Sequence, residues 1–218
     1  MTSDAEMKIY YAERAPYYDA VYAKPERQQD IAFLIHELTA KCQDRQVLEV
    51  ACGTGFWTQH LGPKAASYVA TDALAETLAF AQSRPGVQGL RFRQADAYDL
   101  PTDLGWFDTA FAGLWFSHVP IQQRLSFLRG LHQRLHPSAQ VLLLDNNRVQ
   151  CQELPIVETD AFGNTYQQRP LRDGSTHRVL KNFPDQVELR SLLDELDAEY
   201  TSYQMLDNFW LLQYRLSA

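Results

Sequence analysis

The sequence has few cysteines and no long apolar run. Its three cysteines, Cys42, Cys52 and Cys151, form no Cys-x-x-Cys pair and no spacing typical of a metal site. A small and odd number of cysteines favours a reducing compartment over a framework of disulfide bonds. No stretch approaches the roughly 20 apolar residues that cross a bilayer, so we expect no membrane partner.

The sequence also lacks an excess of positive charge. Its 27 acidic residues outnumber 20 lysines and arginines, which gives a formal net charge of −7. Because lysine and arginine supply most of the affinity for a phosphate backbone, this balance argues against nucleic acid as a partner. Residues 1–8 lack the basic region and apolar stretch of a signal peptide, so we expect a cytoplasmic location.

Nothing in the chain separates it into several domains. It has no internal repeat and no Gly/Ser linker. Hydrophobic residues make up 45% and charged residues 22% of the sequence, which is ordinary for a globular protein. We therefore expect residues 1–218 to form one domain. Its parts are a helical segment over residues 1–42, a core over 46–145, an inserted hairpin over 148–185, and a helix with a strand pair over 186–218.

The core alternates between apolar runs and helical patterns. Buried parallel strands separated by helices indicate an α/β fold with a doubly wound sheet. The expected strands cover residues 46–51, 68–71, 90–94, 107–113 and 140–145, and the expected helices cover residues 56–61, 75–82 and 122–135.

The flanks of the core follow other patterns. Apolar residues at helical spacing predict a helix over residues 27–41, after a tyrosine-rich start. Asp173 and Gly174 favour a tight turn, which predicts a hairpin over residues 165–182. A helix over residues 187–196 and two strands over residues 199–205 and 209–216 are expected at the end.

Residues 47–55 (VLEVACGTG) carry the most information about function. They are typical of a buried strand, a glycine turn and a helix that starts near Phe56. Gly53 permits unusual φ/ψ angles and lets a ligand approach the backbone closely. The N-terminus of the next helix offers free N–H groups to a carboxylate. Asp72 closes the following strand, roughly 20 residues beyond the turn, where it could accept hydrogen bonds from ribose hydroxyls.

This arrangement resembles the cofactor site of class I S-adenosylmethionine-dependent methyltransferases. The family sites occur in order: Glu49 with the glycine turn, Asp72, Asp96 with Ala97, Phe107 with Asp108, and the turn over residues 135–137. The family usually has three glycines in the turn, and Ala51 replaces the first. Alanine is small enough to keep the turn.

The resemblance implies S-adenosyl-L-methionine as the cofactor and S-adenosyl-L-homocysteine as its product. Glu49 would face the ammonium group directly or through water, Asp72 the ribose, and Asp96 the adenine amino group. The other residues expected to bind the cofactor are Ala51, Gly53, Gly55, Ala73, Ala97, Gly113 and Leu114, together with Tyr11, Arg14 and Tyr18 of an N-terminal lid.

The resemblance also implies the fold. Members have a mostly parallel, seven-stranded, Rossmann-like sheet with an antiparallel C-terminal strand. Here an N-terminal helical lid and an inserted β-hairpin would be added. A nicotinamide dinucleotide is the alternative cofactor. Its binding motif, Gly-x-Gly-x-x-Gly or Ala, requires a small residue at the position of Thr58, and Trp57 would crowd a pyrophosphate.

The acceptor is expected beyond the carboxyl ends of the strands. Trp115 and Phe116 could hold it or shield the sulfonium, or they could pack against the next helix. His118 is the candidate general base, with a surface or capping role as the alternative. Asp145 is the other candidate base, and Asn147 could orient the acceptor.

Two features of the sequence leave alternatives open. The inserted hairpin, with Tyr166, could bind substrate or form a dimer surface. Cys52 could be a nucleophile, or a small residue packed beneath a ligand.

The expected function is transfer of a methyl group to an oxygen or nitrogen atom of a small-molecule acceptor, by a monomer or homodimer. A protein or RNA methyltransferase would need an open basic or peptide-width groove. A non-catalytic cofactor-binding module would lack an acceptor cavity.

Overall fold

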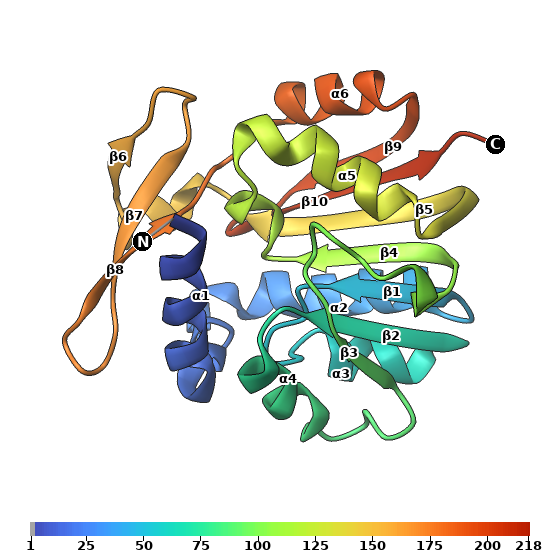
Figure 1. Ribbon diagram of the computed structural model, residues 1–218, viewed down its shortest axis with the longest axis horizontal. Coiled ribbons are helices and arrows are strands. Elements are labelled where there is room, and N and C mark those ends of the chain that lie inside the picture. Colours follow the sequence, from blue (N-terminus) through green and yellow to red (C-terminus); the bar gives the residue numbers. More distant parts are fainter. Residues whose placement is uncertain (1–2) are drawn as a thin grey trace.

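A seven-stranded sheet runs through the molecule in the order β3-β2-β1-β4-β5-β10-β9 (Figure 1). The computed structural model describes residues 3–218, with side chains from residue 6 onward. The strands are β1 (Gln46–Val50), β2 (Ser67–Asp72), β3 (Arg91–Gln94), β4 (Phe107–Gly113), β5 (Leu135–Asn146), β9 (Ala198–Met205) and β10 (Phe209–Leu216). β10 runs antiparallel to both of its neighbours, which confirms the expected fold.

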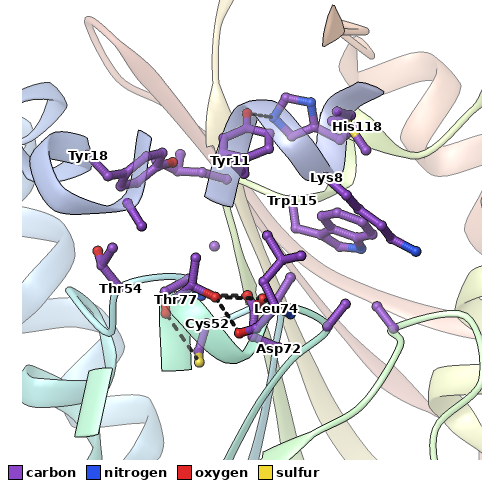
Figure 2. A pocket seen from close by; sticks show the side chains of 18 of the residues that line it. Lys8, Tyr11, Tyr18, Cys52, Thr54, Asp72, Leu74, Thr77, Trp115 and His118 are labelled. Carbon is purple, nitrogen blue, oxygen red and sulfur yellow. Dashed lines mark hydrogen bonds between the residues drawn. The ribbon is translucent and has the colours of Figure 1, made fainter. Parts of the chain in front are cut away.

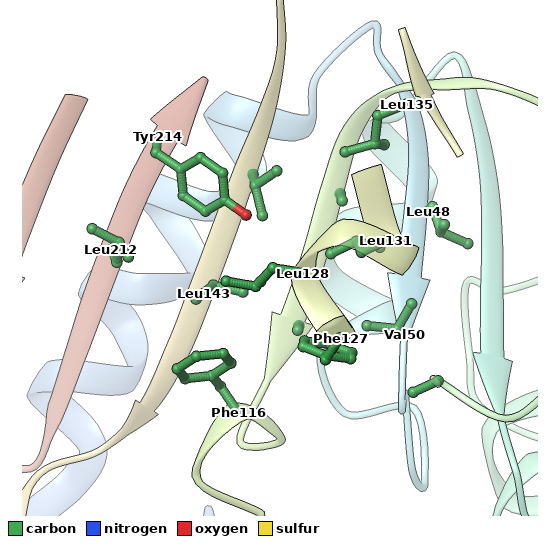
Figure 3. Packing of buried hydrophobic residues seen from close by; sticks show 14 of the residues in the cluster. Leu48, Val50, Phe116, Phe127, Leu128, Leu131, Leu135, Leu143, Leu212 and Tyr214 are labelled. Atoms are coloured by element: carbon green, nitrogen blue, oxygen red, sulfur yellow. The ribbon is translucent and has the colours of Figure 1, made fainter. Parts of the chain in front are cut away.

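Helices cover both faces of the sheet because its strands are apolar on both sides. Successive side chains of β1 point to opposite faces, Leu48 and Val50 to one and Val47 to the other. On the first face pack α5 (Arg124–His132) and α6 (Gln186–Glu195), and Figure 3 shows Leu128 and Leu131 of α5 directed at the sheet. On the second face pack α2 (Gln28–Cys42), α3 (Thr58–Leu61) and α4 (Ala75–Gln82).

A second sheet of three strands, β6 (Ile156–Thr159), β7 (Thr165–Pro170) and β8 (Thr176–Leu180), lies beyond the end of the main sheet. Strands β7 and β8 are the predicted hairpin, and Gly174 in its turn has a φ of +89°. β6 was not predicted, because it is short and three of its four residues are exposed.

Helix α1 (Ser3–Arg14) packs against β8 and lies between the two sheets (Figure 1). A 3-10 helix over Ala15–Val21 continues it. Other short 3-10 helices cover Pro25–Arg27, Gly62–Lys64, Thr102–Leu104, Phe116–His118, Ile121–Gln123 and Arg148–Gln152. The division of the chain into lid, core and cover stays a prediction.

Several element boundaries differ from those expected. α5 ends at His132 instead of residue 135, because Leu135 already pairs with Phe107 in the sheet. Pro137 would also interrupt a longer helix. The helix after the glycine turn begins at Thr58 instead of residue 56. Within residues 3–218, no helix has the length and apolar character needed to pass through a membrane.

Candidate active site

A cavity of about 930 Å³, including its open mouth, lies at the carboxyl ends of β1 to β4 (Figure 2). Parallel strands end at the same edge of the sheet, so the segments that follow them meet there. From the sheet side the lining is residues 51–54, 72–74, 95–98 and 113–115, with Trp57, Thr77 and His118. From the N-terminal side it is Met7, Lys8, Tyr11, Ala15, Tyr18 and Tyr22.

The two glycines of the turn have different surroundings. Gly53 has a φ of +56°, and a Cβ atom placed on it would meet no protein atom within 4 Å. Gly55 has a φ of +77°, and its Cβ would lie 2.8 Å from the Cα of Ala81 in α4. Gly53 therefore leaves room for a ligand, whereas Gly55 allows α4 to pack. Ala51 also has a positive φ of +52°, the region in which the family uses glycine.

Asp72 holds the turn and still faces the cavity. Its Oδ2 accepts from the backbone N–H of Gly53 at 2.8 Å, and its Oδ1 accepts from Leu74 N–H and the Thr77 hydroxyl. Burial raises the pKa of this carboxyl group, although these hydrogen bonds oppose the shift. Because each carboxylate oxygen can accept two hydrogen bonds, Oδ2 keeps a position for a ligand hydroxyl.

Glu49 lies beneath the turn and does not line the cavity. Its Oε2 accepts from the Thr58 hydroxyl at 2.5 Å and from the Tyr68 hydroxyl at 3.0 Å. Burial raises the pKa of Glu49 to about 7, against these two hydrogen bonds. This side chain shares the face of β1 that carries Val47, so the strand alternation directs it at α3. This placement does not support a direct contact of Glu49 with an ammonium group, and a contact through water stays a prediction.

The segment after β3 closes the far end of the cavity. Asp96 Oδ1 accepts from the backbone N–H of Tyr98 at 3.0 Å, and its Oδ2 accepts from Lys8 Nζ at 3.2 Å. Ala97 beside it is 6% exposed and lines the cavity. Lys8 of α1 thus ties the N-terminal helix to this end of the sheet.

His118 and Tyr11 meet at the inner wall of the cavity (Figure 2). His118 Nδ1 lies 2.6 Å from the carbonyl oxygen of Leu180, which can only accept, so Nδ1 carries a proton. Burial and the nearby cations Lys181 and Arg169 hold the pKa of His118 well below 6.5. The ring is therefore neutral, and its Nε2 accepts from the Tyr11 hydroxyl at 2.9 Å.

A second cavity of about 500 Å³, including its open mouth, adjoins the first at this wall. Tyr11, Tyr18, Leu114 and His118 line both cavities. The rest of the second lining is Arg14, Val21, Lys24, Arg27, Asn146, Gln150, Glu153, Leu154, Arg169 and Lys181. Burial raises the pKa of Tyr11 and Tyr18, so both phenols carry their protons at neutral pH.

Lys181 and Asp145 form a buried ion pair beside the second cavity. Lys181 Nζ lies 2.7 Å from Asp145 Oδ1 and donates to the Ser117 hydroxyl at 2.6 Å. Asp145 Oδ2 accepts from the backbone N–H of Ser117. Burial lowers the pKa of Lys181 to about 8, although Asp145 opposes the shift. Burial alone would raise the pKa of Asp145, but Lys181 and His118 hold it below its usual value.

The chain is similar to known proteins in sequence and in structure. A family model described as a methyltransferase domain matches residues 47–138. The solved DhpI-SAM-HEP complex is 29% identical, covers 97% of this chain and 96% of that chain, and superimposes with a TM-score of 0.81. The DhpI-SAH complex is 27% identical, with coverages of 98% and 96% and a TM-score of 0.80.

The chain belongs to the class I S-adenosylmethionine-dependent methyltransferases. A "Probable phthiotriol/phenolphthiotriol dimycocerosates methyltransferase 2" of Mycobacterium ulcerans (strain Agy99) is 42% identical over 73 residues. That match spans 32% of this chain but only 28% of the relative's length. An S-adenosylmethionine-dependent methyltransferase from Clostridium acetobutylicum ATCC 824, with a TM-score of 0.68, is 16% identical and shows the shared fold alone.

The first cavity of the methyltransferase fits S-adenosylmethionine, the cofactor of this family. No protein atom fills the space beside Gly53, and Asp72 Oδ2 can accept a further hydrogen bond from a ligand. Trp115 Nε1 is buried and, within the described residues, has no hydrogen-bond partner. The lining of the first cavity includes Tyr11, Tyr18, Ala51, Gly53, Asp72, Ala73, Asp96, Ala97, Gly113 and Leu114 of the expected cofactor-binding set.

Other expected site residues lie outside both cavities. Phe116 is fully buried and packs against Phe127 and Trp210, the alternative that the sequence left open. Asn147 caps the 3-10 helix at Arg148 by accepting from Val149 N–H. Tyr166 donates to Asp160 and lies beneath the Arg178 guanidinium.

Three more expected residues have roles other than those anticipated. Asp145 is engaged by Lys181, and Gly55 serves the packing of α4. Arg14 lines the second cavity and not the first. Burial raises the pKa of Cys52 far above its usual value, which favours the packing role over the nucleophile.

No pattern in the sequence indicated Arg169 or Lys181 as site residues. Arg169 lies in β7, and Lys181 directly follows β8. Both reach the site because the hairpin folds back against α1 and the segment after β4. A hairpin pattern predicts a turn but not which face of the pair turns inward. Asn146 directly precedes the expected Asn147, and the alternation of β5 directs it at the second cavity.

Proposed function

We propose that the methyltransferase transfers the methyl group of S-adenosylmethionine to an oxygen or nitrogen atom of a small molecule in the second cavity. The observation that carries this proposal is the wall of Tyr11, Tyr18, Leu114 and His118 that both cavities share. Methyl transfer is an in-line displacement, so the acceptor must be held close to the cofactor and aligned with it. Two cavities with a common wall support that arrangement.

The form of the second cavity supports a small acceptor. It is a concave site of about 500 Å³, including its open mouth, and both apolar and polar side chains line it, as in small-molecule sites. Its lining comes from α1, β5, β7 and the segment after β8, which disfavours a long open groove for a peptide or RNA strand. Its presence also disfavours a module that only binds the cofactor. The DhpI complex with both SAM and HEP supports a two-ligand site in this family.

The chain's own contribution to the reaction is alignment and exclusion of water. S-adenosylmethionine supplies, when bound, a methyl group already activated on a sulfonium. Tyr11 and Tyr18 close the site from the N-terminal side, and Leu114 lies beside both cavities at the end of β4. Leu114 holds a φ of +58°, a conformation fixed in part by its backbone hydrogen bond to Leu144. Alignment of this kind contributes most when the leaving group is already activated.

His118 reaches the shared wall, but its Nε2 is occupied by the Tyr11 hydroxyl. An acceptor proton could therefore reach His118 only by a relay through Tyr11. The depressed pKa of His118 makes this ring a weak base. Asp145 lies outside both cavities, and we propose that it positions Lys181 instead of accepting a proton.

A bulky side chain in the second cavity tests the proposal. Gln150 lines only the second cavity, so Gln150→Trp should fill it and leave the cofactor cavity intact. We expect methyl transfer, measured with labelled S-adenosylmethionine on the best acceptor from a small-molecule screen, to fall by at least about tenfold. The affinity for S-adenosylhomocysteine, measured by calorimetry, should change by less than about twofold.

The matched control is Val149→Trp. Val149 is the preceding residue, is 43% exposed and lines neither cavity. It should keep full turnover. Unchanged turnover in Gln150→Trp would show that the acceptor binds elsewhere.

A further inference from the structure

The second cavity carries unbalanced positive charge. One acidic residue lines it, Glu153, against five basic ones: Arg14, Lys24, Arg27, Arg169 and Lys181. Lys24 pairs with Glu153, and Lys181 pairs with Asp145. Over the part of the chain that the structure describes, no carboxylate oxygen lies within 4.0 Å of the other three guanidinium groups. Arg14 and Arg27 are close enough to Glu153 to lower its pKa, but that single carboxylate cannot balance all of these charges, and Arg169 has no carboxylate partner among the described residues.

Arg169 is the most deeply placed of the three, at 4% exposure. Its Nε and Nη2 donate to Gln167 Oε1 at 3.1 and 2.7 Å, and its Nη1 donates to the Tyr11 hydroxyl at 3.0 Å. All of these partners are neutral. Burying a charge without a counter-ion is costly, so the arrangement is suited to an anion that completes it. The contact with Tyr11 places this charge at the wall shared with the cofactor cavity.

Unsatisfied polar atoms point to the same conclusion. Arg27 Nε, Asn146 Oδ1 and Gln150 Oε1 are buried without a hydrogen-bond partner among the described residues, and all three residues line this cavity. Buried polar groups are nearly always hydrogen-bonded in folded proteins, so unpartnered ones in a cavity indicate a ligand. Either carboxamide can rotate to present its NH₂ group, which would add donors to those of the arginines.

We propose that the methyl acceptor is a small oxyanion, a carboxylate or a phosphoryl group, and that its charged oxygen receives the methyl group. This inference rests on the function proposed above. A lone pair of the oxyanion forms the new O–C bond while the C–S bond of the cofactor breaks and its electron pair stays on sulfur. The acceptor loses one negative charge, the sulfonium becomes a neutral thioether, and no proton is released.

The groups around the shared wall agree with an acceptor that is already ionised. His118 Nε2 is engaged by Tyr11, and Asp145 is engaged by Lys181 and Ser117. Neither is free to remove a proton directly, and an oxyanion has none to remove. A cationic ammonium acceptor would instead be repelled by Arg169 and by the excess of positive charge in the lining.

Binding of inorganic anions tests the charge recognition without turnover. Inorganic phosphate and acetate are titrated by calorimetry into the full chain loaded with S-adenosylhomocysteine, at constant ionic strength. We expect at least one of them to bind the wild type, and the tighter of the two to indicate the preferred oxyanion. Arg169→Gln should weaken that binding by at least about tenfold.

Two further variants keep this test decisive. Asn146→Asp has the shape of the wild type but adds a negative charge to the cavity, so it should also weaken anion binding by at least about tenfold. Arg172→Gln makes the same charge change as Arg169→Gln at an exposed position of the same hairpin, and should bind like the wild type. The inference is overturned if neither anion binds the wild type, or if binding survives both cavity variants.

Transfer of labelled methyl separates this inference from the proposed function. The screen contains carboxylic acids, phosphoryl compounds, and amines and amides of matched shape. Label recovered in the methyl ester of a carboxylic acid, which alkali cleaves, or in the alkali-stable methyl ester of a phosphoryl compound, identified by mass spectrometry, supports the inference. Label only on amines or amides overturns it while the proposed function stands. Anion binding as described, with no transfer to any small molecule, supports the charge recognition and removes the proposed function.

Discussion

Glu49 shows how burial changes the task of a carboxyl group at the scale of a single residue. The sequence places it where a family member would contact the cofactor, yet here it is 1% exposed and bonded to Thr58 and Tyr68. Its pKa near 7 follows mainly from burial. Glu49 therefore supports the glycine turn from below, and its ionisation changes the free energy of unfolding.

The pH dependence of the free energy of unfolding should show the raised pKa of Glu49. Its pKa is about 7 in the folded chain, against an ordinary glutamate value of 4.5 in the unfolded chain. Between these values the folded carboxyl binds more protons than the unfolded one, so the free energy of unfolding falls as pH rises through this window. The wild type should lose roughly 3 kcal/mol between pH 4 and pH 8 that Glu49→Gln does not lose.

Urea unfolding at several pH values measures this difference. Glu195→Gln, at an exposed position of α6, is the control and should follow the wild type. Parallel stability curves for the wild type and Glu49→Gln would show that Glu49 titrates normally.

At the scale of elements, the turn between β1 and α3 serves packing and binding with two different glycines. Gly53 and Gly55 both have positive φ angles, but their surroundings differ. A Cβ on Gly55 collides with the backbone of Ala81, so the close approach of α4 depends on this glycine. A Cβ on Gly53 meets no protein atom, so the constraint there comes from the ligand.

Paired alanine substitutions separate the two roles. Gly55→Ala should lower the free energy of unfolding by roughly 2 kcal/mol or more, because backbone strain and a collision add. Gly53→Ala should cost only about 1 kcal/mol from its backbone conformation. It should nevertheless weaken S-adenosylhomocysteine binding by at least about tenfold in calorimetry. Equal stability losses with unchanged cofactor binding in Gly53→Ala would contradict this division of roles.

The sequence predicted the elements of the core better than those of the flanks. Buried parallel strands separated by helices leave a clear pattern, and β1 to β5 all appear near their expected positions. β6 leaves almost none, because it is short and mostly exposed. Phe116 shows a further limit, since an aromatic residue after a strand can face a cavity or the core, and here it faces the core.

At the scale of the whole molecule, the site is assembled from three distant segments. Tyr11 comes from α1, His118 from the segment after β4, and Arg169 from β7; Tyr11 lies 107 residues from His118 and 158 from Arg169. The resemblance in the sequence indicated the first two as candidates. It could not indicate the third, since the position of Arg169 depends on how the small sheet packs on α1.

The same assembly explains why the two cavities share a wall. Helix α1 lies between the main sheet and the small sheet, so one face of its side chains can contact both ligands (Figure 1). The first cavity is lined mainly by segments that follow strands of the main sheet, and the second mainly by the flanks. The family model therefore covers most of the first lining, whereas most of the second lies outside the matched residues.

Binding of the cofactor by calorimetry most directly tests the central claim, that the first cavity holds S-adenosylmethionine. We expect S-adenosylhomocysteine to bind the wild type with a micromolar Kd, and Asp72→Asn to weaken it by at least about thirtyfold, or roughly 2 kcal/mol. Asp103→Asn, whose side chain is 64% exposed, should bind like the wild type. No heat of binding with the wild type, or equal affinity in a folded Asp72→Asn variant, would contradict the assignment of the first cavity as the cofactor site.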